Sequence, residues 1–221
     1  MLKQKMELED NASHWRERCQ REGFELHDAS RPPDDWRLFY SLAKNRRNLL
    51  KNPRADDEFQ DWNIIQNGGD CWEISGNRYP FPDSKVTKCF VTSYMLCLKQ
   101  QLIDLKKEGY TDAFMDQMQP HIKISDWYTA RTDCGSEYHI CVELLDWRRN
   151  PITIFQPEKA IFSYGNDEPW CQMTHVFKDY GPGVRFIRFT HGGKDRQFWA
   201  GWYGIRVTNS SVEIWPAEER D

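Results

Sequence analysis

The feature that most constrains the fold is a series of short alternating segments that begins near Trp62. In SEYHICVELL, apolar and polar side chains alternate along the whole stretch, with Tyr138, Ile140, Val142 and Leu144 between Glu137, His139, Cys141 and Glu143. This period of two places one set of side chains on the core face of an antiparallel strand. Similar strands are expected in CWEIS, CFVTSYML, HIKISDWYTA, PITIF, CQMTHVFKD, VRFIRF and SVEIW. Glycine-rich turn signals such as Gly192-Gly193 separate them, so the sequence predicts a mainly β fold, an antiparallel β-sandwich.

The first thirty residues have no such alternation and predict a helix. Asn11 or Ser13 could cap it, and Gly23 would end it. The tandem prolines of RPPDD then interrupt the helical period. We therefore divide the chain into a helical N-terminal extension, residues 1–30, and a β-sandwich domain, residues 31–221.

Two further helices are expected within the larger domain. Asp34 or Asp35 should begin one, because an apolar stripe follows at helical spacing, formed by Trp36, Phe39, Tyr40 and Ala43. The segment TDAFMDQM predicts a short helix between two of the strands.

Composition excludes several classes of function. The formal net charge is −4, and the isoelectric point is about 5.9, so no clustered positive charge favours a nucleic acid. The chain begins without the apolar segment of a signal peptide and has no apolar run long enough for a membrane span. Its seven cysteines form no CxxC pair, which predicts reduced thiols in the cytosol, with no metal and no cofactor.

No catalytic constellation stands out. The sequence lacks a GxSxG elbow and an HExxH motif. Cys141 follows His139 by two residues, but both should lie on the outer face of their strand. His175 and His191 are expected to be hydrogen-bonded structural residues. No Asp or Glu has an apolar setting that would demand a raised pKa. We therefore expect a protein that is not an enzyme.

The segment HGGKDRQFWAGWYG concentrates large rings among glycines. Exposed rings bind the apolar face of a sugar, and they also stack on nucleic-acid bases when a positive groove accompanies them. Phe198 and Trp199 are the candidates for exposure. Trp202 and Tyr203 are expected to enter the next strand, beginning near Gly201, and to join the core.

Several long segments resemble one known family. NRRNLLKNP, NGGDCWEI, CFVTSYMLCLKQQLIDLKKEGY, ISDWYTARTDCG, THVFKDYGPGVRFIRFTHGGKD and QFWAGWYGIRVTNSS are similar to the F-box-associated (FBA) domain of sugar-recognising F-box proteins. The likeness covers about residues 34–216. It implies an antiparallel β-sandwich of about ten strands, of jelly-roll or galactose-binding-like type, with short helices at its N-terminal end.

The resemblance also implies a ligand. Glycan-binding members grip the chitobiose core of high-mannose N-glycans and mark misfolded glycoproteins for ubiquitination. Carried over to this sequence, Tyr94 and Trp199 would supply ring faces, Asp133 would accept hydrogen bonds, and Phe198 and Ala200 would complete the site. Strong binders tend to have Tyr at the position of Phe198 and Lys at that of Ala200, so the affinity for sugar is expected to be reduced.

The N-terminal residues depart from the family, because they lack the leucine-rich pattern of an F-box. Engagement of the Skp adaptor and cullin is therefore not expected. Three alternatives stay open: a lectin-like module that binds N-glycosylated proteins, a protein-interaction or receptor-like domain that has lost sugar binding, and the substrate-recognition component of an SCF-type ubiquitin ligase.

Overall fold

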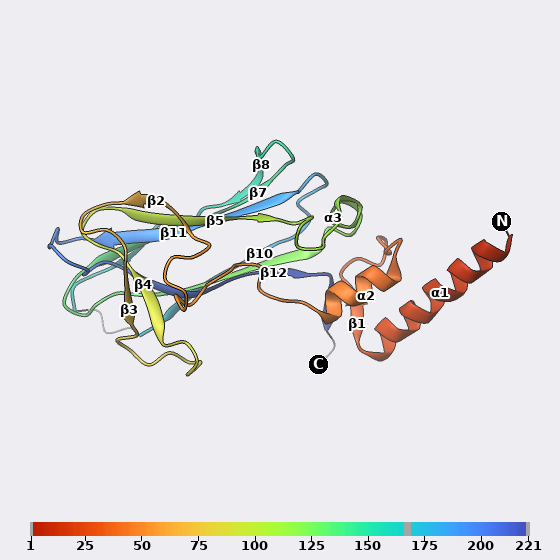
Figure 1. The fold of residues 1–221 in the computed structure, drawn as a ribbon, viewed down its shortest axis with the longest axis horizontal. Helices are drawn as coiled ribbons and strands as arrows, with labels where there is room; N and C mark the ends of the chain where they lie inside the picture. Colours follow the sequence, from red (N-terminus) through yellow and green to blue (C-terminus); the bar gives the residue numbers. More distant parts are fainter. Residues whose placement is uncertain (1, 166–168, 220–221) are drawn as a thin grey trace.

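The computed structural model describes residues 2–165 and 169–219 and shows two packed β-sheets with helices gathered at one end (Figure 1). The helices are α1 (Leu2–Arg21), α2 (Trp36–Lys44) and α3 (Asp112–Met118). The strands are β1 (Phe24–Leu26), β2 (Asn63–Asn67), β3 (Glu73–Gly76), β4 (Lys88–Val91), β5 (Cys97–Asp104), β6 (His121–Thr129), β7 (Ser136–Leu145), β8 (Pro151–Phe155), β9 (Ala160–Phe162), β10 (Cys171–Phe177), β11 (Phe186–Asp195), β12 (Arg206–Trp215) and β13 (Ala217–Glu219). The predicted fold class, a mainly antiparallel β-sandwich, is confirmed.

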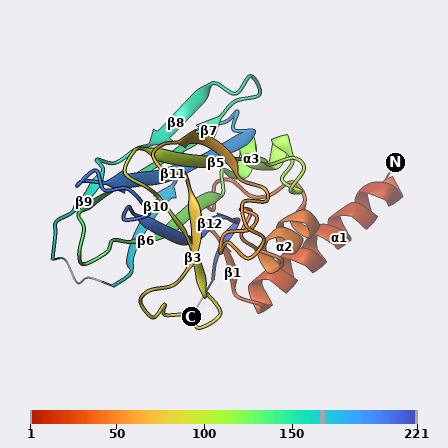
Figure 2. The ribbon, with the colours of Figure 1, turned by 60° about the vertical axis from the view of Figure 1, so that its left-hand side comes forward.

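Two large sheets form the sandwich. One has the strand order β10-β6-β12-β4-β3, and the other has the order β2-β5-β11-β7-β8, with β9 beside β7. The pairings in both are antiparallel. A separate two-stranded sheet joins β1 to β13, so the N-terminal segment pairs with the C-terminal one. Figure 2 shows the two sheets as layers, with α1 and α2 projecting from one end.

The core lies between the two sheets and follows the alternation of the sequence. In β7 the apolar set is buried as expected, with Tyr138, Ile140, Val142 and Leu144 at most 5% exposed. The Tyr138 ring stacks on the Tyr128 ring of β6 in the opposite sheet, with centroids 3.9 Å apart. Burying each such ring stabilises the fold by about 1.5–3 kcal/mol.

The helices agree with the sequence in two cases of three. Asp35 caps α2 by accepting a hydrogen bond from the backbone N–H of Leu38, and the helix buries Phe39 and Tyr40. The expected helix at TDAFMDQM is α3, which Thr111 caps.

The expected start of the first helix was wrong. α1 already begins at Leu2, so neither Asn11 nor Ser13 is its cap. Asn11 instead accepts a hydrogen bond from the indole N–H of Trp15, one turn further along. Within the described residues no helix combines the length and the apolarity that a membrane crossing requires.

Two expected boundaries of strands were also wrong. CFVTSYML does not form one strand: β4 ends at Val91, and a loop precedes β5. Gly192 and Gly193 make no turn but lie inside β11, between β5 and β7. A Cβ atom added at Gly193 would lie 1.9 Å from the carbonyl oxygen of Glu137, so this close approach of two backbones requires glycine.

A polar cluster lies inside the core. The Asp126 carboxylate, fully buried, accepts hydrogen bonds from Tyr138 (2.6 Å), His191 (2.7 Å) and Ser210 (2.7 Å). Burial lowers the pKa of His191 to about 4. This fits the expectation that His191 is a hydrogen-bonded structural residue rather than an exposed ligand.

Candidate functional site

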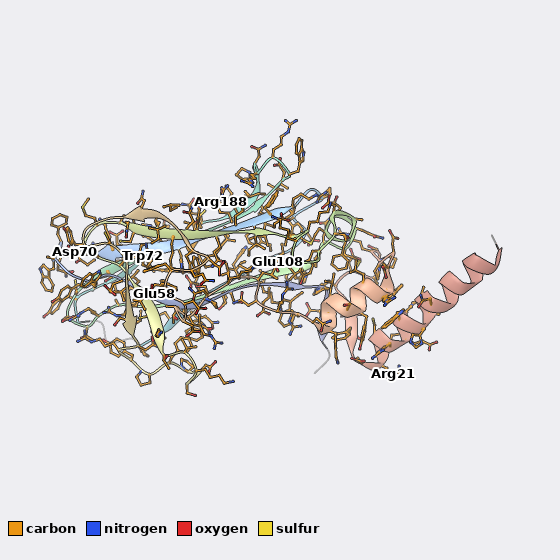
Figure 3. All side chains as sticks on the ribbon, viewed as in Figure 1. Arg21, Glu58, Asp70, Trp72, Glu108 and Arg188 are labelled. Atoms are coloured by element: carbon orange, nitrogen blue, oxygen red, sulfur yellow. The ribbon has the colours of Figure 1, made fainter. Side chains whose placement is uncertain are left out.

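Four loops meet at the end of the sandwich opposite the helices, and we call them the loop rim. They are residues 68–72, 92–96, 130–135 and 196–205, and each connects a strand of one sheet to a strand of the other. Asp70 of the first loop marks this end in Figure 3, far from Arg21 of α1. Because all four connections cross between sheets at the same end, their side chains converge there.

A buried carboxylate shapes the loop that carries the rings. Asp195, only 1% exposed, accepts hydrogen bonds from the backbone N–H groups of Phe198 (2.7 Å) and Trp199 (3.3 Å). This cap holds Phe198 at a φ of 58°, a left-handed conformation that is unfavourable for an aromatic residue. Such strain persists where the surroundings enforce it, and it often marks binding sites.

Asp195 corrects one expectation from the sequence. Burial raises its pKa above the ordinary value, although the backbone N–H groups oppose this shift. Contrary to the expectation, the protein thus contains a carboxyl group whose surroundings raise its pKa. Its hydrogen bonds are to the loop backbone, so its role is to position the rings.

Other contacts fasten the same loop to its neighbours. Gly201 donates its N–H to the Asp70 carboxylate, and its carbonyl accepts a 2.7 Å hydrogen bond from the Ser93 hydroxyl. The backbone N–H of Arg196 donates to the carbonyl of Gly135 at 2.8 Å. Three loops of the rim are thus tied to the fourth, which makes the rim a preorganised surface.

The rings of this loop differ in exposure. Phe198 is 70% exposed and Trp199 42%, as expected from the sequence. Trp202 is 40% exposed, so its expected burial in the core was wrong. Its indole N–H donates to the carbonyl of Cys71 at 3.1 Å, which holds it in the loop, and β12 begins only at Arg206. Tyr203 likewise precedes the strand and is half-buried.

The structure brings Tyr94 and Phe198 together and places Trp199 beside another ring. The rings of Tyr94 and Phe198 meet edge to face with centroids 4.9 Å apart. Trp199 makes a similar contact with Tyr203 at 5.6 Å. Edge-to-face pairs of this kind contribute about 0.5–1.5 kcal/mol beyond the burial of their area, so they help to fix the positions of these rings.

Asp133 joins this surface indirectly, through Arg131. Both oxygens of its carboxylate accept hydrogen bonds from the Arg131 guanidinium, at 2.6 Å for the Nε–Oδ1 pair. Arg131 in turn lies over the Tyr203 ring, 4.3 Å from its centroid. The hydrogen bond from Arg131 lowers the pKa of Asp133. Asp133 is therefore ionised at neutral pH and part of an ion pair, with its side chain 44% exposed.

A groove of about 460 Å³ adjoins the rings. Its walls come from the rim and from β3, β4 and β12, and are formed by Glu73, Ile74, Ser75, Val91, Arg131, Ala200, Gly201, Trp202, Tyr203 and Arg206. Ala200 thus lies where a longer side chain would reach into the groove. Arg206 is 5% exposed, and its Nε has no hydrogen-bond partner among the described residues.

Sequence reasoning missed three residues of this site: Arg131, Trp202 and Arg206. Arg131 had a usable signal, since it precedes Asp133 by two residues in ARTDCG and an acid-base pair at that spacing can form locally. Arg206 had no such signal in the sequence, because the burial of its side chain depends on packing between strands that are distant in sequence.

His139 and Cys141, two residues apart in β7, are not arranged for nucleophilic catalysis. His139 bonds Glu137 at 3.1 Å, and burial raises the pKa of Cys141, which disfavours the thiolate. His175 stacks on Phe155, with centroids 4.0 Å apart. None of the seven cysteines, all within the described residues, forms a disulfide.

Comparison with protein families gives a match to the F-box associated region over residues 40–214. The chain belongs to this FBA family. The match includes all four loops of the rim, so the surface described above is part of the FBA domain. The resemblance expected from the sequence is thereby confirmed.

The FBA relatives that it resembles are F-box proteins. It is 47% identical to F-box only protein 44 of Homo sapiens, with 95% of this chain and 84% of the relative covered. It is 48% identical to F-box only protein 6 of Bos taurus, with 94% and 80% covered. The solved structure of TmCBM61 with beta-1,4-galactotriose aligns at a TM-score of 0.44 and 14% identity, covering 75% of this chain and 97% of that one. A likeness this distant says nothing about the function of this protein.

Proposed function

We propose that this FBA domain is a non-enzymatic lectin-like module that binds the chitobiose core of high-mannose N-glycans through the loop rim. The observation that carries the proposal is the exposure of Phe198, Trp199 and Trp202 on one loop that is fixed to its neighbours. A pyranose presents an apolar C–H face, and a ring held at a protein surface is the complementary partner for it.

Polar groups beside the rings supply partners for hydroxyl and acetamido groups. The Asp133 carboxylate is 44% exposed and can accept hydrogen bonds from a ligand, and the Arg131 guanidinium fixes its direction. The volume of the adjoining groove, about 460 Å³, is in the range typical of sites for small ligands. These features support binding of one or two sugar units.

The affinity is expected to be low, for a reason that can be tested. Phe198 lacks a phenol hydroxyl, and Ala200 offers no charged donor to the groove that it borders. A hydrogen bond from a charged donor contributes about 1.5–3 kcal/mol, or about tenfold or more in affinity. The double variant Phe198→Tyr/Ala200→Lys should therefore bind glycan at least tenfold more tightly.

Calorimetric titration with a chitobiose-containing N-glycan tests the proposal. Trp199→Ala should abolish the binding. Trp147→Ala is the matched control, because Trp147 is a 69% exposed indole just beyond the end of β7 that lies away from the rim. Flat titrations for the wild type and for the Phe198→Tyr/Ala200→Lys variant, at millimolar glycan, would refute the proposal.

A protein-interaction role is a second candidate, favoured by a different surface. One edge of the six-stranded sheet carries exposed apolar side chains on β8 and β9, where Ile154 is 52% and Ile161 51% exposed. Apolar groups on an edge strand are typical of interaction surfaces. This role predicts a partner that is retained after enzymatic deglycosylation and after Trp199→Ala, and is lost with Ile154→Asp.

A place in an SCF-type ubiquitin ligase is suggested by the names of the relatives, which are F-box only proteins. Under this proposal the module would present misfolded glycoproteins in the cytosol. Affinity capture from cytosolic extract tests it: recovery of the Skp adaptor and a cullin supports the role, and their absence alongside recovered glycoproteins refutes it.

A further inference from the structure

A cluster of metal-binding side chains lies at the opposite end of the sandwich from the rim. His27 follows β1, His121 is the first residue of β6, and Glu218 is the middle residue of β13. One nitrogen of each imidazole and one carboxylate oxygen all lie within 4.8 Å of one another. The region is where the N-terminal and C-terminal segments meet, near α2 in Figure 1.

The hydrogen bonding of His27 leaves one nitrogen directed into this cluster. Its Nε2–H donates to the carbonyl oxygen of Trp215 at 2.7 Å, which fixes the tautomer and leaves a lone pair on Nδ1. A metal-binding histidine is typically oriented in this way, by a backbone carbonyl on its second nitrogen. The His27 side chain is 8% exposed, and its Nδ1 has no hydrogen-bond partner among the described residues.

The distances within the cluster suit ligands of one ion. The Nδ1 atoms of His27 and His121 lie 3.0 and 3.6 Å from the same oxygen of Glu218. Two ligands of a tetrahedral zinc ion are about 3.4 Å apart, given bonds of 2.0–2.2 Å. The Glu218 oxygen is close to the Nδ1 of His27 and yet is not its hydrogen-bond acceptor, because Nδ1 carries no proton in the tautomer that Trp215 fixes.

The two imidazoles stack on each other, with centroids 3.5 Å apart and an angle of 23° between the planes. Because the lone pair of Nδ1 lies in the plane of its ring, one ring must tilt before both nitrogens can bind the same ion. Trp215 holds His27 through its Nε2–H, so His121 is the ring that would tilt. β1 pairs with β13 so that Glu25 lies opposite Glu218, and His27, two residues further along, is the diagonal neighbour of Glu218 without any metal. The three ligands are therefore close together before binding, and the change required is a rotation of the His121 ring.

We propose that His27, His121 and Glu218 bind a divalent transition-metal ion such as Zn²⁺, with water at the fourth position. The ion would fasten the N-terminal segment to the sandwich, because its ligands come from β1, β6 and β13. No sequence motif predicts this site, since neighbouring members of the set are separated by more than ninety positions and no local spacing relates them.

Titration of the full chain with Zn²⁺ after treatment with a chelator tests the proposal. The wild type should bind one equivalent with a rise in melting temperature, because the metal binds the folded state. Glu218→Gln and His121→Ala should weaken binding by about 10–100-fold or more. Glu218 is the safer variant, since its side chain is 53% exposed and its replacement leaves the core intact.

Two controls separate this site from adventitious binding. His14→Ala removes an exposed histidine on α1 and should leave the affinity unchanged. Co²⁺ should bind without the thiolate charge-transfer band that any of the seven cysteines would produce. No one-equivalent binding at sub-millimolar Zn²⁺, binding that Glu218→Gln leaves unchanged, or a thiolate band would each overturn the proposal.

Discussion

Lys99 gives the sharpest test of the energetics of this core. Its side chain is fully buried in β5, and its ammonium nitrogen has no hydrogen-bond partner among the described residues. The nitrogen lies 3.0 Å from the centroid of the Trp62 ring and 3.8 Å from that of Phe90. Burial lowers the pKa of Lys99 well below its ordinary value.

Two effects oppose each other at this position. Ring faces stabilise a desolvated ammonium by about 2 kcal/mol or more. Full burial of a charge without a hydrogen bond costs more than this, so the group gives up its proton instead. We therefore expect a neutral amine in the folded protein and a charged one in the unfolded chain.

Lys99→Met should stabilise the protein. Methionine has a similar length and needs no hydrogen bond, so near pH 10, where the unfolded lysine is about to lose its own proton, the variant should gain about 1–3 kcal/mol, the cost of a buried donor without a partner. This corresponds to about 2–12 °C in melting temperature for a chain of this size. Lys88→Met, an exposed lysine in β4, is the matched control and should change stability by less than about 0.5 kcal/mol.

The pH dependence gives a second readout. Below the pKa of the unfolded lysine, about 10.4, the unfolded state binds a proton that the folded state does not, so the stability of the wild type falls as pH falls. Relative to Lys99→Met, the wild type should lose about 1.4 kcal/mol per pH unit over the range in which only the unfolded lysine is charged.

Urea unfolding of both proteins between pH 7 and 10 measures this difference, because groups common to both cancel. The reasoning is refuted if Lys99→Met is less stable than the wild type by 2 kcal/mol or more, about the worth of the ring contacts, and the difference does not vary with pH. That result would mean that Lys99 is a charged residue stabilised by its rings.

Two other substitutions test the close approach of strands and the cap of the rim loop. Gly193→Ala should destabilise the fold by more than about 3 kcal/mol in chemical unfolding, because the new Cβ would collide with the backbone of β7, whereas Gly76→Ala, with nothing closer than 3.9 Å, should be tolerated. Asp195→Ala should lower glycan affinity about tenfold or more in calorimetry, because Phe198 and Trp199 lose the acceptor of their N–H groups; unchanged affinity would show that the cap is not needed.

The strand pattern could be predicted because it depends on local alternation. The residues that alternate in β7, such as Val142, are buried as their period requires. The position of Gly192 and Gly193 inside a strand could not be predicted, since a double glycine is typical of a turn and also of a place where three strands approach closely. That distinction depends on β5 and β7, which are distant in sequence.

The rim could be predicted only in part, for a similar reason. Exposure of Phe198 and Trp199 followed from their place in a glycine-rich loop. The apolar strand that follows Trp202 predicts a place in the core for it, but the hydrogen bond to Cys71 holds Trp202 in the loop. That bond joins two loops of the rim and has no signal in the sequence near either residue.

Lectin-like binding at the rim is the central claim, and indole resonances of tryptophan-labelled protein test it most directly. During a titration with chitobiose, the Nε1–H signals of Trp199 and Trp202 should shift and saturate together, while the signal of Trp147 stays in place. Movement of Trp147 alone, or no movement of the two rim indoles at saturating sugar, would contradict the account.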